Sequence, residues 1–222
     1  MTTLLTGPSL PPAAGGRPKA LVVLLHGLGA DGADLIGLGH AWAAELAGTA
    51  FVAPDAPYPC DFAPSGRQWF SMREIDQGAI LAALAEVAPS LDRFIDAELE
   101  RLDLSAKDLA LVGFSQGAML ALHAGLRRTQ SPAAIIAYSG CLVGPERLAD
   151  ELRGRPPVLL VHGDRDEVVE PQFMPASEAA LKAAGVPVNA LWRPGLGHGI
   201  DEAGMRAGLA QLKRALPGGG GP

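Results

Sequence analysis

The pentapeptide Gly113-Phe114-Ser115-Gln116-Gly117 lies between two segments of contrasting pattern. Before it, residues 109–112 (Leu-Ala-Leu-Val) form a short apolar run that is typical of a buried strand. After it, residues 118–124 are rich in good helix formers. A serine between a strand end and a helix start, with a glycine two positions to either side, is the pattern of a nucleophile elbow. Side chains at positions 113 and 117 would collide with backbone in so tight a turn, which would hold the Ser115 hydroxyl above the sheet.

Composition indicates one globular domain with a substantial core. The chain has 222 residues, of which 48% are hydrophobic and 19% charged. The net charge of −6 disfavours nucleic acid and anionic membranes as partners. Residues 1–19 lack the pattern of a secretory signal, and no apolar run approaches the roughly 18 residues of a membrane span. We expect a cytoplasmic protein without stable membrane insertion, with one domain over residues 1–217 and a disordered tail at 218–222.

Two cysteines, Cys60 and Cys141, lie far apart in the sequence. In a chain without an export signal, this favours two free thiols over a disulfide. So few soft ligands also argue against a zinc site. We therefore expect neither a metal nor a cofactor.

Apolar runs alternate with segments of helical periodicity along most of the chain. The expected strands are residues 4–10 (at an edge), 20–25, 50–53, 109–112, 133–138, 158–161 and 188–192. The expected helices are residues 34–46, two helices within 77–102 separated at Pro89, the helix after Ser115, and residues 175–184 and 200–216. This alternation predicts an α/β fold, with a mostly parallel central sheet and helices on both faces. In such sheets, function gathers at the carboxyl ends of the strands.

Residues 55–71 form a 17-residue irregular segment, in which prolines separate aromatic side chains. A loop of this length in a compact domain is usually a lid or a binding loop. We expect Phe62, Trp69 and Phe70, together with Leu28, to wall an apolar acyl pocket. The alternative is that these side chains anchor the loop to the core.

A serine hydroxyl is a poor nucleophile at neutral pH, so it needs a base within hydrogen-bond reach to take its proton. Four of the five histidines suit a place on a helix or a packing role at a strand end: His26, His40, His123 and His162. For example, His123 lies eight residues beyond Ser115 on the same helix, about 12 Å along its axis. His198 stands in the flexible sequence Gly195-Leu196-Gly197-His198-Gly199, where core packing does not account for it. We therefore favour His198 as the base.

Asp164 and Asp166 both follow the strand at residues 158–161. Asp164 comes directly after a glycine and suits the turn, whereas Asp166 is better placed to extend toward a histidine. Earlier aspartates suit turns, helix caps or the lid: Asp31, Asp34, Asp55 and Asp61. The resulting order, Ser115, Asp166, His198, is the order of an α/β-hydrolase triad, and it is independent of the pentapeptide.

An oxyanion hole needs two backbone N–H donors aimed at the developing negative charge. Gln116, directly after the nucleophile, supplies one. The glycine-rich segment 26–32 after an earlier strand supplies the other, from Leu28; it lacks the lysine and the Gly-x-Gly-x-x-Gly pattern of a phosphate loop. Because Gln116 would act through its backbone, we expect Gln116→Ala to be mild.

Four motifs together resemble the phospholipase/carboxylesterase family of α/β-hydrolases: residues 26–32 (His-Gly-Leu-Gly-Ala-Asp-Gly), 113–118 (Gly-Phe-Ser-Gln-Gly-Ala), 162–166 (His-Gly-Asp-Arg-Asp) and 197–198 (Gly-His). They span nearly the whole chain in the family's order. The resemblance implies Ser115, Asp166 and His198 as the triad, and Leu28 and Gln116 as oxyanion donors. Residues 67–70 (Arg-Gln-Trp-Phe) are similar to the family's tryptophan segment beside the site. Residues 56–64 resemble the small bacterial carboxylesterases more than the eukaryotic acyl-protein thioesterases.

The resemblance implies an α/β-hydrolase fold with a minimal lid loop and no cap domain. It also implies a serine carboxylesterase that cleaves esters, or thioesters, of small or medium acyl groups without a cofactor. One alternative is an acyl-protein thioesterase or lysophospholipase. A peptidase or acyltransferase with the same triad and a catalytically inactive binding module are further alternatives. The expected partner is a small-molecule ester, and the sequence leaves a homodimer open.

Overall fold

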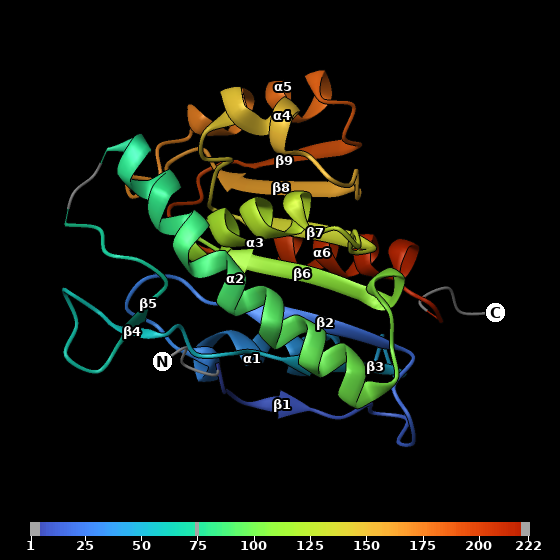
Figure 1. The fold of residues 1–222 in the computed structure, drawn as a ribbon. Coiled ribbons are helices and arrows are strands. Elements are labelled where there is room, and N and C mark those ends of the chain that lie inside the picture. Colours follow the sequence, from blue (N-terminus) through green and yellow to red (C-terminus); the bar gives the residue numbers. More distant parts are fainter. Residues whose placement is uncertain (1–4, 74–75, 219–222) are drawn as a thin grey trace.

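A seven-stranded sheet forms the centre of the computed structural model, which describes residues 5–73 and 76–218 (Figure 1). The strand order is β1-β3-β2-β6-β7-β8-β9, and only the β1–β3 pairing within this sheet is antiparallel. The bounds are β1 Ser9–Leu10, β2 Ala20–Leu25, β3 Thr49–Val52, β6 Leu109–Phe114, β7 Ala134–Tyr138, β8 Val158–Gly163 and β9 Val188–Arg193.

Helices cover both faces of this sheet. On one face lie α1 (Gly32–Trp42) and α6 (Glu202–Ala215), and on the other lie α2 (Gln77–Leu102), α3 (Gln116–Arg127), α4 (Leu148–Glu151) and α5 (Phe173–Ala183). There are also two short 3₁₀ turns, η1 (Ala106–Asp108) and η2 (Pro145–Arg147). The predicted α/β architecture with a mostly parallel sheet is confirmed.

Strand β2 shows why the apolar runs form this sheet. All six of its residues are buried, and they alternate between the two core clusters. Leu21, Val23 and Leu25 pack toward α2 and α3, whereas Ala20, Val22 and Leu24 pack toward α1 and α6. A strand covered on both faces has no use for polar side chains, which explains its continuous apolar sequence.

The predicted break at Pro89 is wrong, because residues 77–102 form the single helix α2 with Pro89 inside it. Proline lacks the N–H that would bond to the carbonyl of Ala85, so it weakens the helix at this point. The apolar face continues on both sides of the proline, with Leu84 and Leu91 completely buried in the same core cluster. Packing of this continuous face keeps the helix intact across the proline.

Several predicted boundaries also shift. The first strand covers only Ser9–Leu10 of the predicted residues 4–10, and residue 4 lies outside the described part. Helix α1 ends at Trp42 rather than Leu46, and the residues after it form turns, in which the Glu45 N–H bonds to the Trp42 carbonyl three residues back. The irregular segment 55–71 contains a small antiparallel hairpin, β4 (Tyr58–Pro59) with β5 (Arg67–Gln68). Of the predicted tail, residues 219–222 lie outside the described part.

The direction of the chain across the sheet reverses between β2 and β6. From β2 the chain moves to β3 on one side, and later returns to β6 on the other side of β2. Loops that leave the carboxyl ends of two such strands diverge and open a crevice at this point. The loop after β2 and the Ser115 turn after β6 therefore meet at the switch point of the sheet.

Candidate active site

Ser115 occupies a strained turn between β6 and α3. Its backbone has φ 55° and ψ −119°, a conformation that residues other than glycine seldom adopt. A Cβ atom at Gly113 would lie 2.3 Å from the Gly117 carbonyl oxygen, and one at Gly117 would lie 2.0 Å from the Leu25 carbonyl oxygen. Both glycines are therefore required by close backbone contacts, as the sequence predicts.

His198 lies between Ser115 and Asp166 and is hydrogen-bonded to both. The distance from His198 Nε2 to Ser115 Oγ is 2.9 Å, and from His198 Nδ1 to Asp166 Oδ2 it is 2.8 Å. The carboxylate can only accept, so Nδ1 carries the proton and donates it to Asp166. Nε2 is then free to accept from the serine hydroxyl. The ring of Phe114 packs against the imidazole with 4.8 Å between ring centroids.

The Asp166 carboxylate is buried and meets donors at both oxygens. Oδ1 accepts the backbone N–H groups of Val168 and Val169, each at 2.9 Å. Oδ2 accepts from His198 and lies 3.2 Å from His162 Nε2. Burial raises the pKa of Asp166, but the bonds from His198, Val169 and Val168 outweigh it and leave the pKa below its ordinary value. This carboxylate is held ionised.

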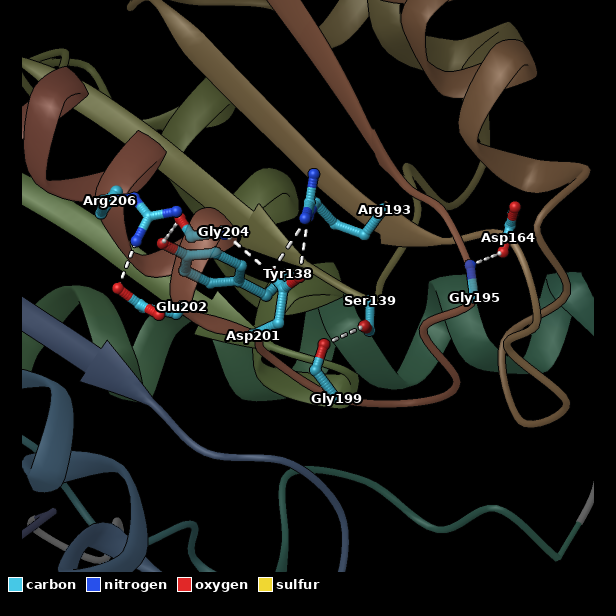
Figure 2. A network of polar contacts seen from close by, with 10 residues as sticks. All are labelled: Tyr138, Ser139, Asp164, Arg193, Gly195, Gly199, Asp201, Glu202, Gly204 and Arg206. Atoms are coloured by element: carbon cyan, nitrogen blue, oxygen red, sulfur yellow. Dashed lines mark hydrogen bonds and ion pairs between the residues drawn. The ribbon is translucent and has the colours of Figure 1, made fainter.

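Polar contacts fix the segment that carries His198 at both ends (Figure 2). Before the histidine, the Gly195 N–H donates to Asp164 Oδ1 at 2.6 Å. After it, Ser139 Oγ donates to the Gly199 carbonyl at 3.1 Å. The remaining pairs anchor the start of α6: Arg193 Nε with Asp201 Oδ2 at 2.9 Å, Tyr138 Oη with the Gly204 carbonyl at 3.1 Å, and Glu202 with Arg206. Asp164 lies in the turn after β8, as the sequence predicts, but its side chain holds the loop that carries His198 rather than its own turn.

The predicted oxyanion donors lie on two neighbouring loops. Residues 27–30 form a turn closed by the Ala30 N–H on the Gly27 carbonyl at 3.3 Å, with Leu28 at its second position and Gly29 at φ +79°. Gly27 lies so close to the elbow that a Cβ there would be 3.3 Å from the Ser115 Cβ. Gln116 is the first residue of α3, beside the nucleophile. Both N–H groups therefore belong to backbone that flanks the serine.

The three aromatic side chains predicted to wall the acyl pocket lie in two different environments. Trp69 and Phe70 are buried in the core, at 0% and 2% exposure, whereas Phe62 is 64% exposed. Trp69 and Phe70 also line an open cavity of about 770 Å³ beside the β4–β5 hairpin. Ser115 and Phe62 are not among the residues that line this cavity. The burial of Trp69 and Phe70 matches the alternative expectation, that they anchor the loop.

A second cavity, of about 230 Å³, lies between the nucleophile helix and the acid loop. Its lining is mostly apolar: Met72, Gln77, Ile80, Met119, Cys141, Leu142, Val143, Val168, Val169 and Phe173. Met119 lies one turn beyond Ser115, whose carbonyl accepts its N–H, and Val168 and Val169 hold Asp166. The sequence did not predict this cavity. The only available signal was the apolar pair Val168-Val169, which lies in a loop two residues after Asp166.

Two of the other histidines, His26 and His162, hold the backbone of nearby loops. His26 is buried and donates from Nδ1 to the Gly27 carbonyl, while its Nε2 accepts the Ala56 N–H. His162 donates from Nε2 to the Val169 carbonyl. His40 is exposed on α1 and His123 is buried on α3. None of the four contacts Ser115 Oγ through a hydrogen bond in the described structure.

Cys60 and Cys141 are free thiols, and burial raises the pKa of Cys141 to about 11. Within the described ranges, no group of three or more His, Cys, Asp or Glu side chains is arranged to hold a metal ion. In the same part of the chain, no helix has the length and apolar character needed to cross a membrane.

Comparison with known proteins agrees with this geometry. Residues 13–215 match the family model described as Phospholipase/Carboxylesterase. The chain is 28% identical to esterase YpfH of Escherichia coli K12, over 90% of this chain and 84% of that protein. It is 29% identical to acyl-protein thioesterase 1 homolog 1 of Dictyostelium discoideum, over 81% of this chain and 83% of that protein. The crystal structure of esterase PE8 superposes with a TM-score of 0.93 at 42% identity, covering 96% of this chain and all of that one.

The family model covers most of the chain, and the superposition on esterase PE8 covers 96% of it. The predicted α/β-hydrolase fold is confirmed on these grounds, with no added domain in the described structure. The protein is a carboxylesterase-family serine hydrolase, and the chain belongs to the phospholipase/carboxylesterase family.

Proposed function

We propose that this protein hydrolyses carboxylic esters of small or medium acyl groups through an acyl-enzyme on Ser115. The observation that carries the proposal is the pair of hydrogen bonds that join His198 to Ser115 and to Asp166, at 2.9 and 2.8 Å. A serine, a base within reach of its hydroxyl and an ionised acid that orients the base are together the requirements for acyl transfer.

In the proposed mechanism, Ser115 Oγ attacks the ester carbonyl while its proton passes to His198 Nε2. Asp166 stabilises the imidazolium through Nδ1, and the N–H groups of Leu28 and Gln116 bind the oxyanion. Collapse of the tetrahedral intermediate breaks the bond to the leaving alcohol, which takes the proton from Nε2. Water then repeats the sequence on the acyl-serine and releases the acid.

The apolar cavity beside Met119 supports the preference for small or medium acyl groups. At about 230 Å³ it lies below the 300–1,000 Å³ that is usual for ligand pockets. Each methylene group buried there would contribute roughly 0.8 kcal/mol to binding. We assign the acyl chain to this cavity. Trp69, Phe70 and Phe62 were expected to wall the acyl pocket; because they do not line this cavity, we propose instead that they contact the leaving-group side of the substrate.

A second candidate function is thioester hydrolysis, as in an acyl-protein thioesterase. The observation that favours it is the 29% identity with the Dictyostelium protein of that name. The same triad can attack either carbonyl, because the difference lies in the leaving group. We further propose a cytoplasmic location and a single domain over residues 1–217.

A panel of p-nitrophenyl esters from acetate to palmitate, beside a palmitoyl thioester, tests the proposal. We expect the highest kcat/KM with short or medium esters, and Ser115→Ala should reduce kcat by at least about 10⁴-fold. A fluorophosphonate should label the native protein and not the Ser115→Ala variant.

Ile80→Trp tests the acyl cavity separately, because Ile80 lines it from α2 without contacting the triad. This variant should shift the preference toward acetate while kcat on acetate stays unchanged.

Equal labelling of the native protein and Ser115→Ala would contradict the hydrolase mechanism. A preference for the long thioester would contradict the assignment of esters.

A further inference from the structure

The side chain of Gln116 bonds to the backbone of a distant segment. The residue is only 3% exposed. Its Oε1 accepts the Trp69 N–H at 2.7 Å, and its Nε2 donates to the Phe70 carbonyl at 2.8 Å. These two bonds use the acceptor and a donor of the amide and fix its orientation. The turn that carries the nucleophile is thereby clamped to residues 69–70.

The same segment is bonded to the loop that carries Leu28. Trp69 Nε1 donates to the His26 carbonyl at 2.9 Å. The Gly29 N–H donates to the Arg67 carbonyl, and the Arg67 N–H donates to the Ala30 carbonyl, each at 2.9 Å. The loop is therefore held before and after Leu28, and residues 67–70 form a strap between the two sides of the site.

Gly66 confirms how closely the strap approaches the loop. A Cβ atom at this position would lie 2.3 Å from the Gly29 carbonyl oxygen and 2.7 Å from its Cα. Contacts of this kind with backbone cannot be relieved by a rotamer change. The position of the loop around Leu28 therefore depends on the position of the strap.

We infer that Gln116 is a positioning residue, whose side chain keeps the two oxyanion donors at the spacing that the oxyanion requires. This inference rests on the proposed function. One donor, the Gln116 N–H, belongs to the residue whose side chain holds the strap. The other, the Leu28 N–H, belongs to the loop that the strap holds. Donors must lie within about 2.7–3.1 Å of the oxyanion to stabilise it, so their spacing decides how well the transition state is bound.

Burial of an amide is costly unless it is hydrogen-bonded, and an apolar side chain of the same size could fill the same space. Gln116 instead directs its polar groups to the main chain of the strap. The expectation that Gln116→Ala is mild considered only the backbone N–H, so the structure changes that expectation. Loss of the side chain releases the strap, and a donor displaced by about 1 Å can cost about 10²-fold in rate.

Gln116→Met tests this role, because methionine keeps the volume and removes both hydrogen bonds. Gln211→Met is the matched control: Gln211 is also buried, at 4% exposure, and accepts from Arg214 on α6, away from the site. The assay measures kcat and KM on a p-nitrophenyl ester per fluorophosphonate-titrated site. It also measures inhibition by an alkyl trifluoromethyl ketone, which forms an oxyanion on the serine.

We expect Gln116→Met to lower kcat by about 10- to 100-fold and to weaken inhibition by the ketone by a similar factor. Its KM should stay within about twofold of the native value. Gln211→Met should leave all three unchanged, even if both variants unfold at lower temperature. A role in stability alone would lower the melting temperature of Gln116→Met and spare kcat per titrated site.

Unchanged kcat and ketone binding in Gln116→Met would overturn the inference, while ester hydrolysis by the native protein would leave the proposed function intact. If Gln116→Met does not fold, Gly66→Ala provides the test. Its added Cβ would collide with the Gly29 backbone and displace the strap at the end away from Gln116. Gly66→Ala should show the same fall in kcat with KM preserved, and native kcat in this variant would overturn the inference.

Discussion

Replacing Asp166 by asparagine tests the triad through the direction in which the new amide must point. Oδ1 accepts the N–H groups of Val168 and Val169, each at 2.9 Å. An NH₂ group at that place would leave two buried donors unpaired, at about 1–3 kcal/mol each. The orientation that places the amide oxygen at the Oδ1 position is therefore favoured over the flipped one by about 2–6 kcal/mol, and in it the NH₂ group faces His198 Nδ1.

That orientation reverses the roles of the two imidazole nitrogens. Nδ1 must accept from the asparagine NH₂, so in the neutral ring the proton moves to Nε2. Nε2 lies 2.9 Å from Ser115 Oγ and can then no longer take the serine proton. The same change of tautomer costs about 10⁴ in kcat in the serine-protease example of such a triad. A factor of this size corresponds to about 5 kcal/mol in the activation free energy.

Steady-state kcat on a p-nitrophenyl ester measures the effect, with the melting temperature as a check on folding. Asp164→Asn is the matched control, because an asparagine oxygen can still accept the Gly195 N–H that Asp164 accepts at 2.6 Å. We expect this control within about threefold of native kcat, since the Gly195 bond is retained. A kcat for Asp166→Asn within tenfold of the native value, or an equal loss in Asp164→Asn, would refute the reasoning.

Two further predictions concern stability. Burial and then the charge of Arg127 lower the pKa of His123 to about 4 from 6.5. Above pH 6.5 this side chain is neutral in folded and unfolded chains alike. As the pH falls from 6.5 to about 4, only unfolded chains take up the proton, so stability is lost across this window, by about 3 kcal/mol at most. Urea unfolding at pH 7 and pH 4.5 should show a smaller loss for His123→Leu than for the native protein. Gly37→Ala should raise the free energy of unfolding by about 0.5–1 kcal/mol, because it lies inside α1 and a Cβ there meets nothing within 4 Å. Gly117→Ala should lower the melting temperature sharply, because its Cβ would lie 2.0 Å from the Leu25 carbonyl oxygen. Equal effects of the two glycine changes would contradict this packing.

Local pattern was sufficient for the central buried strands and for the tight turn at Ser115. The apolar run at residues 20–25 predicts a buried strand, and β2 has the same bounds. Gly113 and Gly117 predict a turn too tight for side chains, and in the structure the backbone lies too close to both positions to admit a Cβ. Such features depend on neighbours in the chain, and the amino-acid sequence therefore carries them directly.

The chain order Ser115, Asp166, His198 was also available from sequence, because the three residues follow the strands β6, β8 and β9 of the parallel part of the sheet. The distances between their side chains could not be predicted from sequence. The 2.9 Å and 2.8 Å contacts of His198 depend on bonds that hold its loop, such as that between Ser139 and Gly199. Those partners are 60 positions apart, and no local periodicity relates them.

Long-range packing decided the remaining features. Pro89 should end a helix by its own chemistry, yet the apolar face of α2 packs on one core cluster along its length and keeps the helix continuous. Gln116 carries a side-chain role that appears only once residues 69–70 lie against the elbow. The sequence by itself predicted most of the strands and helices, the elbow turn at Ser115 and the chain order of the candidate triad, because these follow from sterics and periodicity along the chain. Only the tertiary structure decided the strap, the apolar cavity beside Met119 and the spacing of the proposed oxyanion donors, because each depends on contacts between segments that folding alone brings together.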